Sequence, residues 1–102
     1  MVLVLKTYLN DCSFMFYKCD KIISIDLSTI PEHNITNMNS MFNSCTNLKF
    51  IDLYSINTRN VIDMSYMFYK CRDLNFINIF NFSTIKVTNM EKMFSDCYNL
   101  KK

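Results

Sequence analysis

The hydrophobic and polar positions of this chain recur with a period of 26 residues. The clearest marker is the motif Met-Phe-x-x-Cys, which keeps its register over four copies and begins at Met15, Met41, Met67 and Met93. A fixed period of about 20–29 residues is typical of chains built from one stacked strand-plus-helix unit. The pattern therefore predicts that residues 1–102 form a single repeat array of about four units.

Each unit contains a short stretch with the spacing of a half-buried strand. The three copies read Ile22-x-x-Ile25-x-Leu27, Leu48-x-x-Ile51-x-Leu53 and Leu74-x-x-Ile77-x-Ile79. This spacing is the strand signature of leucine-rich repeats. Because side chains alternate along a strand, Ile51 and Leu53 should face a core while residues 50, 52 and 54 face outward. We expect parallel pairing between residues 48–53 and 74–79.

A second apolar pattern in each unit has helical spacing. Met38, Met41, Phe42 and Cys45 stand at i, i+3, i+4 and i+7, which predicts one apolar helical face about two turns long. An Asp or Asn precedes each such segment and could cap a helix N-terminus; these residues are Asp11, Asn37, Asp63 and Asn89. Helices this short are marginal alone, so neighbouring units must stabilise them.

Together these elements predict an α/β repeat, a curved solenoid of the leucine-rich-repeat type. Strands stack at about 4.8 Å and helices at about 8–10 Å, so the parallel strands should line the concave face and the short helices the convex face. The expected core of the middle unit is Leu48, Ile51, Leu53, Ile56, Val61, Met64, Met67, Phe68 and Cys71.

The two ends of the array are incomplete units without a polar cap. Met1, Val4 and Leu9 match the phase of residues 27, 30 and 35, and Leu100 matches Leu74. Solenoids normally need polar capping units for solubility. We interpret the chain as an excerpt of a longer array; the alternative is a short protein whose uncapped ends associate end to end with another chain.

The units resemble the BspA-like leucine-rich-repeat surface proteins. The resemblance rests on the pattern N-V-T-N-M-x-x-M-F-x-x-C-x-x-L-x-x-L-D-L, which residues 34–53 match most clearly and residues 87–100 repeat. It covers residues 8–102 and implies a cell-surface or secreted protein that binds a host protein or matrix, with no catalytic residues. The family often has Gly just before the cysteine; here Lys18, Ser44, Lys70 and Asp96 stand there.

Composition excludes several other classes of function. The net charge is +2 and the basic residues are scattered apart from Lys101 and Lys102, so no nucleic-acid or anionic membrane partner is expected. The apolar opening Met1–Leu5 is too short for a signal-peptide core or a membrane span. The chain has no Gly, so its left-handed turn positions should be filled by the abundant Asn.

The sequence offers no catalytic, metal or cofactor site. The five cysteines lack the close spacing of zinc ligands, and equivalent cysteines in a stack point in parallel, which disfavours disulfides. We interpret them as buried free thiols, and seven of the eight methionines as core residues. The single histidine, His33, is expected on the solvated surface and completes no nucleophile–base set.

The outward face of the strands is the candidate binding site. It places aromatic residues on both sides of a polar column, and the residues chosen are Phe50, Asp52, Tyr54, Phe76, Asn78 and Phe80. Exposed aromatics beside hydrogen-bonding groups are typical of recognition surfaces for a protein or glycan partner. The alternative is that aromatic residues simply favour strands and pack across them. A structural spacer without a ligand, or an intracellular interaction protein in the cytoplasm, also fits the sequence.

Overall fold

Five short strands form two parallel sheets in the part of the chain that the computed structural model describes, residues 9–30 and 33–101. One sheet pairs β1 (Leu9–Asp11) with β3 (His33–Asn37). The other has the order β2 (Ser24–Ile25), β4 (Phe50–Asp52) and β5 (Phe76–Asn78). The expectations for Met1–Leu5 and for the His33 side chain lie outside the described residues.

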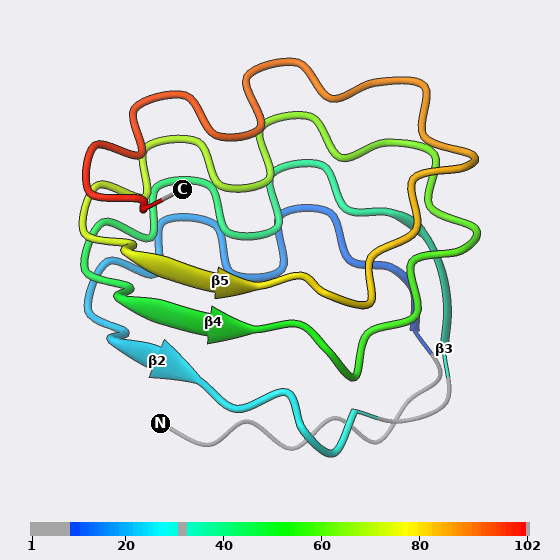
Figure 1. Cartoon of the computed structure of the whole chain (residues 1–102), viewed down its shortest axis with the longest axis horizontal. Helices are drawn as coiled ribbons and strands as arrows, with labels where there is room; N and C mark the ends of the chain where they lie inside the picture. Colours follow the sequence, from blue (N-terminus) through cyan, green and yellow to red (C-terminus); the bar gives the residue numbers. More distant parts are fainter. Residues whose placement is uncertain (1–8, 31–32, 102) are drawn as a thin grey trace.

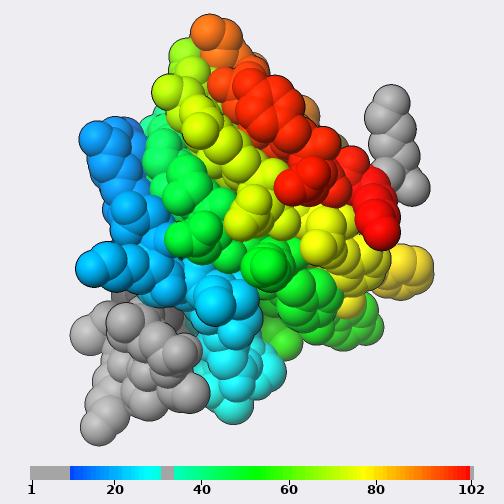
Figure 2. Space-filling view, turned by 90° about the vertical axis from the view of Figure 1, so that its left-hand side faces the viewer, coloured from blue at the N-terminus to red at the C-terminus, as the bar shows by residue number. Residues whose placement is uncertain are grey.

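The sequence period sets the register of the second sheet. Phe50 pairs with Phe76 and Asp52 with Asn78, both in parallel, which confirms the predicted pairing of residues 48–53 with 74–79. The chain therefore lies as four successive layers, beginning at Asp11, Asn37, Asp63 and Asn89. Figure 1 shows the β2–β4–β5 sheet on one side and undulating segments on the other, each layer beside the next. Figure 2 shows the same layers as adjacent bands of colour.

The predicted helices are wrong. The described residues contain no helix, and each segment expected to be helical is a pair of consecutive tight turns. In the second layer the Met41 N–H donates to the Met38 carbonyl and the Cys45 N–H to the Phe42 carbonyl, at 3.2 and 3.1 Å. The third residue of each turn, Ser40 or Ser44, has positive φ, as in type II turns. Two such turns place their first and fourth residues inward, which reproduces the apolar spacing of a helix.

The hydrogen bonds between layers explain why turns replace helices. The N–H groups of Ser40, Phe42 and Ser44 donate to carbonyls of the following layer at 3.0, 2.9 and 2.7 Å. A helix would use these donors internally and would need about 8–10 Å from its neighbour. Layers joined by strands at about 4.8 Å leave no room for that separation. The turn segments satisfy both the spacing and the backbone donors.

The expectation of a leucine-rich-repeat solenoid with a concave and a convex face is also wrong. The molecule is a compact globule with extents of 30 × 30 × 22 Å. Phe42 and Phe68 on the turn side stack at 5.2 Å between ring centroids, and Phe50 and Phe76 on the strand side at 5.4 Å. Because both sides have the same spacing, the geometric reason for curvature is absent. The chain is therefore not a repeat-protein solenoid.

The predicted core of the middle unit is confirmed. All nine of its residues have no exposed surface, and they belong to one hydrophobic cluster between the β2–β4–β5 sheet and the turns. Four phenylalanines form a continuous stack in it, with centroid distances of 5.2–5.6 Å and nearly parallel rings; they are Phe16, Phe42, Phe68 and Phe94. The methionine prediction holds for most positions, but Met90 is 47% exposed.

No Asn among the described residues has left-handed backbone, contrary to the expectation from the sequence. Among the described residues the positive φ values, 52° to 64°, occur at Phe14, Lys18, Ser40, Ser44, Tyr66, Lys70, Lys92 and Asp96. Half of these positions are the ones just before the cysteine, where the resembled family often has Gly. The Asn and Asp residues instead cap turns through their side chains. The Asn37 and Asp63 Oδ1 atoms each accept the N–H two residues ahead at 2.8 Å, in place of the helix caps expected there.

Candidate functional site

Exposed aromatic side chains lie on the β2–β4–β5 sheet and just after its strands. Phe50 and Phe76 form one column, 44% and 53% exposed, and stack with an interplanar angle of 4°. Tyr54 and Phe80 follow the ends of β4 and β5 and are 53% and 88% exposed. The alternation of side chains along β4 buries Ile51 and turns Phe50 and Asp52 toward solvent. All four predicted aromatic residues are therefore exposed, two on the sheet and two just after its strands, and we call this set the aromatic face.

A column of polar residues lies beside the Phe50–Phe76 stack. It consists of Asp26, Asp52 and Asn78, one residue from each of the first three layers. In each case the Oδ1 atom accepts the backbone N–H two residues ahead, at 2.9 Å for Asp52 and 3.2 Å for Asn78. These bonds turn the chain at the end of each strand. Asp52 and Asn78 thus have a structural role that the binding-site prediction did not include.

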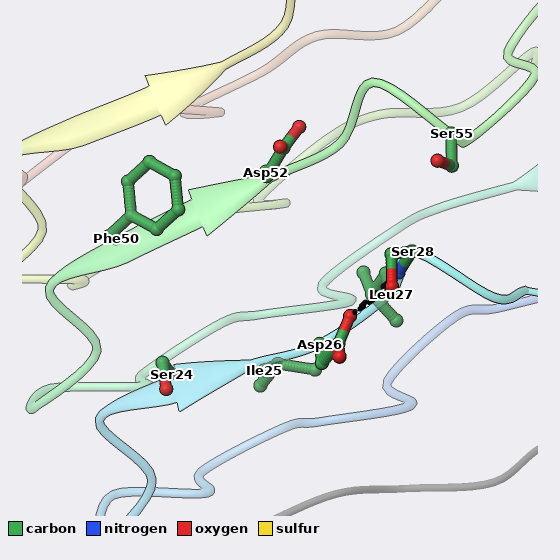
Figure 3. Close-up of a pocket in the computed structure, with 8 residues that line it drawn as sticks. All are labelled: Ser24, Ile25, Asp26, Leu27, Ser28, Phe50, Asp52 and Ser55. Atoms are coloured by element: carbon green, nitrogen blue, oxygen red, sulfur yellow. Dashed lines mark hydrogen bonds between the residues drawn. The ribbon is translucent and has the colours of Figure 1, made fainter.

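A shallow pocket of about 340 Å³ adjoins the aromatic face at its β2 end. Its lining residues are Ser24, Ile25, Asp26, Leu27, Ser28, Phe50, Asp52 and Ser55. Figure 3 shows the Phe50 ring beside β4 and the Asp52 carboxylate at the end of that strand. The hydroxyl and amide of Ser28 donate to Asp26 Oδ1 and lower the pKa of that carboxyl. The pocket therefore combines a negative charge with an aromatic wall.

The sequence prediction omitted the β2 part of this pocket. Ser24, Asp26 and Ser28 are exposed, but they have no aromatic side chain and were not among the predicted binding residues. One sequence signal did point to this part of the pocket. Asp26 lies one period before Asp52, so it occupies the equivalent outward position, and Ser28 follows it at the spacing of an Asp-x-Ser turn. Ser55 could not be placed from the pattern because it follows the end of the strand.

Four of the five cysteines form a column on the turn side of the molecule; they are Cys19, Cys45, Cys71 and Cys97. The Sγ atoms of Cys45 and Cys71 donate to the carbonyls of Phe16 and Phe42, both at 3.1 Å, and Cys97 repeats the contact to Phe68 at 3.0 Å. All five cysteines are free thiols; Cys12, Cys45 and Cys71 are buried, while Cys19 and Cys97 are partly exposed. Sequence spacing indicated the column but not the thiol–carbonyl bonds, which depend on the turns.

Alkaline pH should destabilise the folded protein through these thiols. Burial raises the pKa of Cys45 from 9.0 to about 12 and that of Cys12 to about 11. A pKa that is raised by folding contributes stability that is fully present below pH 9.0 and is lost as pH rises through the folded value. We expect the urea midpoint of unfolding to fall between pH 9.0 and 12. Cys45→Ala should weaken this fall, and an equally steep fall in that variant would contradict the assignment.

Within residues 9–30 and 33–101, no three His, Cys, Asp or Glu side chains gather in a way that could hold a metal ion. The same ranges contain no helix with the length and apolar character needed to cross a membrane.

Comparison with known proteins places the chain in a family. It belongs to the family described as "Mycoplasma protein of unknown function, DUF285", whose model matches residues 10–102. No curated protein and no solved structure matches the chain significantly.

Proposed function

We propose that this chain is a non-catalytic binding module that recognises a protein partner through its aromatic face. The observation that carries the proposal is the exposure of Phe50 and Phe76 on the β2–β4–β5 sheet and of Tyr54 and Phe80 just after the same strands. Aromatic side chains dominate binding energy at protein interfaces because they bury a large area at a small entropic cost. Four of them within two adjacent layers make a concentrated recognition surface.

The orientation of the rings favours a protein over a glycan. Phe50 and Phe76 lie face to face, so one face of the Phe50 ring is covered by its neighbour. A sugar ring usually packs flat against an open aromatic face, whereas apolar protein side chains can pack against ring edges. The Asp26 and Asp52 carboxylates beside the rings would attract basic groups of the partner. A partner segment with apolar and basic side chains therefore fits best.

The proposed location is the cell surface or the extracellular space, which rests on the resemblance to BspA-like surface proteins. Free cysteines are a difficulty in an oxidising environment because the thiolate is the reactive form. Burial reduces that difficulty by raising the pKa of Cys12 and Cys45, so these thiols stay protonated at neutral pH.

Removing the aromatic side chains tests the proposal. Replacing Phe50, Tyr54, Phe76 and Phe80 together by Ser should leave the fold intact, because each side chain is more than 40% exposed. Binding to a panel of immobilised extracellular-matrix proteins should weaken by at least about 2 kcal/mol, roughly thirtyfold. Binding is measured by surface plasmon resonance and folding by circular dichroism.

A matched control carries Phe14→Ser, Tyr17→Ser and Ile62→Ser. These residues are 53%, 41% and 49% exposed and lie away from the aromatic face. The control should bind as the unmodified chain does. Unchanged binding by the fourfold variant would contradict the aromatic face as the site, and no binding by the unmodified chain would favour the spacer alternative.

A further inference from the structure

The outward positions of β2 carry small side chains where the next layer carries aromatic rings. Ser24 pairs with Phe50, and Phe50 with Phe76, in the parallel register of the sheet. Ser28 likewise stands one period before Tyr54. The ring stack on the sheet therefore ends at Phe50 because the paired strand β2 has Ser at that position. Phe76 covers one face of the Phe50 ring, and the other face lies on the side of Ser24.

The hollow beside these serines is the pocket of about 340 Å³ at β2. Phe50 lines this pocket and Phe76 does not, which places the pocket on the uncovered face of the Phe50 ring. Figure 3 shows the ring on β4 and the short Ser24 side chain on β2. Pockets for small molecules have volumes of about 300–1,000 Å³. This pocket is at the lower end of that range, so it suits a single side chain of a partner.

Negative charge is concentrated at the pocket. Asp26 and Asp52 line it, whereas the next position of the same polar column is the neutral Asn78. The Oδ1 atom of each carboxylate accepts the backbone N–H two residues ahead. The Oδ2 atoms accept no hydrogen bond from the residues that the structure describes. Each carboxylate therefore keeps one oxygen for a ligand that donates hydrogen bonds.

An aromatic face beside two carboxylates defines the chemistry of the occupant. The face of a phenylalanine ring attracts a cation. A planar guanidinium group can lie flat on a ring while its N–H groups donate to carboxylates at its edge, whereas an ammonium group is a compact and strongly hydrated charge. We propose that the pocket binds an arginine side chain of the protein partner, stacked on Phe50 and paired with Asp26 and Asp52. This inference rests on the proposed function, because it names a residue that the aromatic face recognises.

Titration of the full chain with Nα-acetyl-arginine methylamide, followed by nuclear magnetic resonance, tests the pocket. At a salt concentration of about 0.15 M, which screens non-specific attraction, the amide resonances of residues 24–28 and of β4 should shift and saturate at about 1–10 mM probe. The corresponding lysine probe and the uncharged citrulline probe should bind about tenfold more weakly. The absence of saturable shifts, or equal binding of either alternative probe, would overturn the proposal.

Ser24→Phe fills the pocket by extending the ring stack. The next two strands carry phenylalanine at this position, so the sheet accommodates the larger side chain. Binding of the arginine probe should weaken at least about tenfold, because the Phe50 ring is then covered on both faces. Arginine binding that survives this substitution, with the fold verified by circular dichroism, would overturn the proposal.

Asp26→Asn and Asp52→Asn remove the charges without filling the pocket. Both variants should keep the turn at the end of the strand, because Asn78 accepts the equivalent backbone N–H through its own Oδ1. Each should weaken binding of the arginine probe about threefold. The control is Asp20→Asn, which removes an exposed carboxylate that does not line the pocket and should leave binding unchanged. Equal effects of all three substitutions would reduce the carboxylates to general attraction and overturn their role.

The arginine pocket and the proposed function fail in different ways. If the fourfold Ser variant of the aromatic face loses its partner but the unmodified chain does not bind the arginine probe, the arginine pocket is wrong and the binding module stands. If the probe saturates the pocket but the fourfold variant still binds its partner, the proposed function is wrong and the arginine pocket stands.

Discussion

Replacing Phe68 by Ala should lower the free energy of unfolding by about 3–5 kcal/mol. Phe68 has no exposed surface and stacks on Phe42 and Phe94 at 5.2 and 5.6 Å. The substitution opens a cavity between two layers whose backbones are fixed by hydrogen bonds, so the surroundings cannot collapse to fill it. Since small domains have only about 5–15 kcal/mol of stability, the loss should be visible as a large shift of the urea midpoint.

Phe76→Ala is the matched control for this prediction. Phe76 also stacks on a phenylalanine of the adjacent layer, at 5.4 Å, but it is 53% exposed. Its loss should cost about 1 kcal/mol, because it forfeits one aromatic contact and little buried area. Equal losses for Phe68→Ala and Phe76→Ala would show that the turn-side stack is not the main source of stability.

Ser44 should respond in opposite directions to Pro and to Gly. Its φ is 64°, and its N–H donates to the Tyr69 carbonyl at 2.7 Å. Pro cannot adopt this φ and has no N–H, so Ser44→Pro should cost about 3 kcal/mol or more. Ser44→Gly should raise stability by about 0.5 kcal/mol, because removing the left-handed strain outweighs the greater freedom of Gly in the unfolded chain. Urea unfolding of both variants measures the two effects.

Asn43→Gly provides the control in the same turn. Asn43 precedes Ser44 and does not have positive φ, so Gly relieves no strain there. The substitution also removes the Asn43 Nδ2 hydrogen bond to Ser40 Oγ. It should therefore lower stability by about 0.5–1 kcal/mol. If both Gly variants shifted stability in the same direction, the left-handed turn at Ser44 would not be a point of strain.

The candidate site could be predicted where a residue's position depends on strand alternation alone. Phe50 and Phe76 face outward because Ile51 and Ile77 are needed inside, and one period of the sequence sets their pairing. The pocket at β2 and the role of Asp52 in turning the chain could not be predicted in this way. Both depend on how the chain leaves the strand, which the side-chain pattern of the strand does not specify.

On the turn side of the molecule, the spacing of the apolar residues fits two structures, a short helix and a pair of consecutive turns. Met38, Met41, Phe42 and Cys45 would lie on one face of a helix, and they also lie inward in two consecutive turns. Local propensity cannot separate these structures, since a two-turn helix is marginal by itself. The helix prediction was wrong because the separation between neighbouring layers excludes a helix, and that separation is not a property of any single segment.

The amino-acid sequence by itself determined the period, the residues that are buried in the middle layer, and the register of β4 on β5. These follow from alternation and repetition, which are properties of the linear pattern. Only the tertiary structure decided that the Met-Phe-x-x-Cys segments are turns, that their strained positions fall on Ser, Lys, Tyr, Phe and Asp, and that the molecule is a compact globule. The physical reason is the common spacing of the layers: strands and turns can both hydrogen-bond at about 4.8 Å, and a helix cannot.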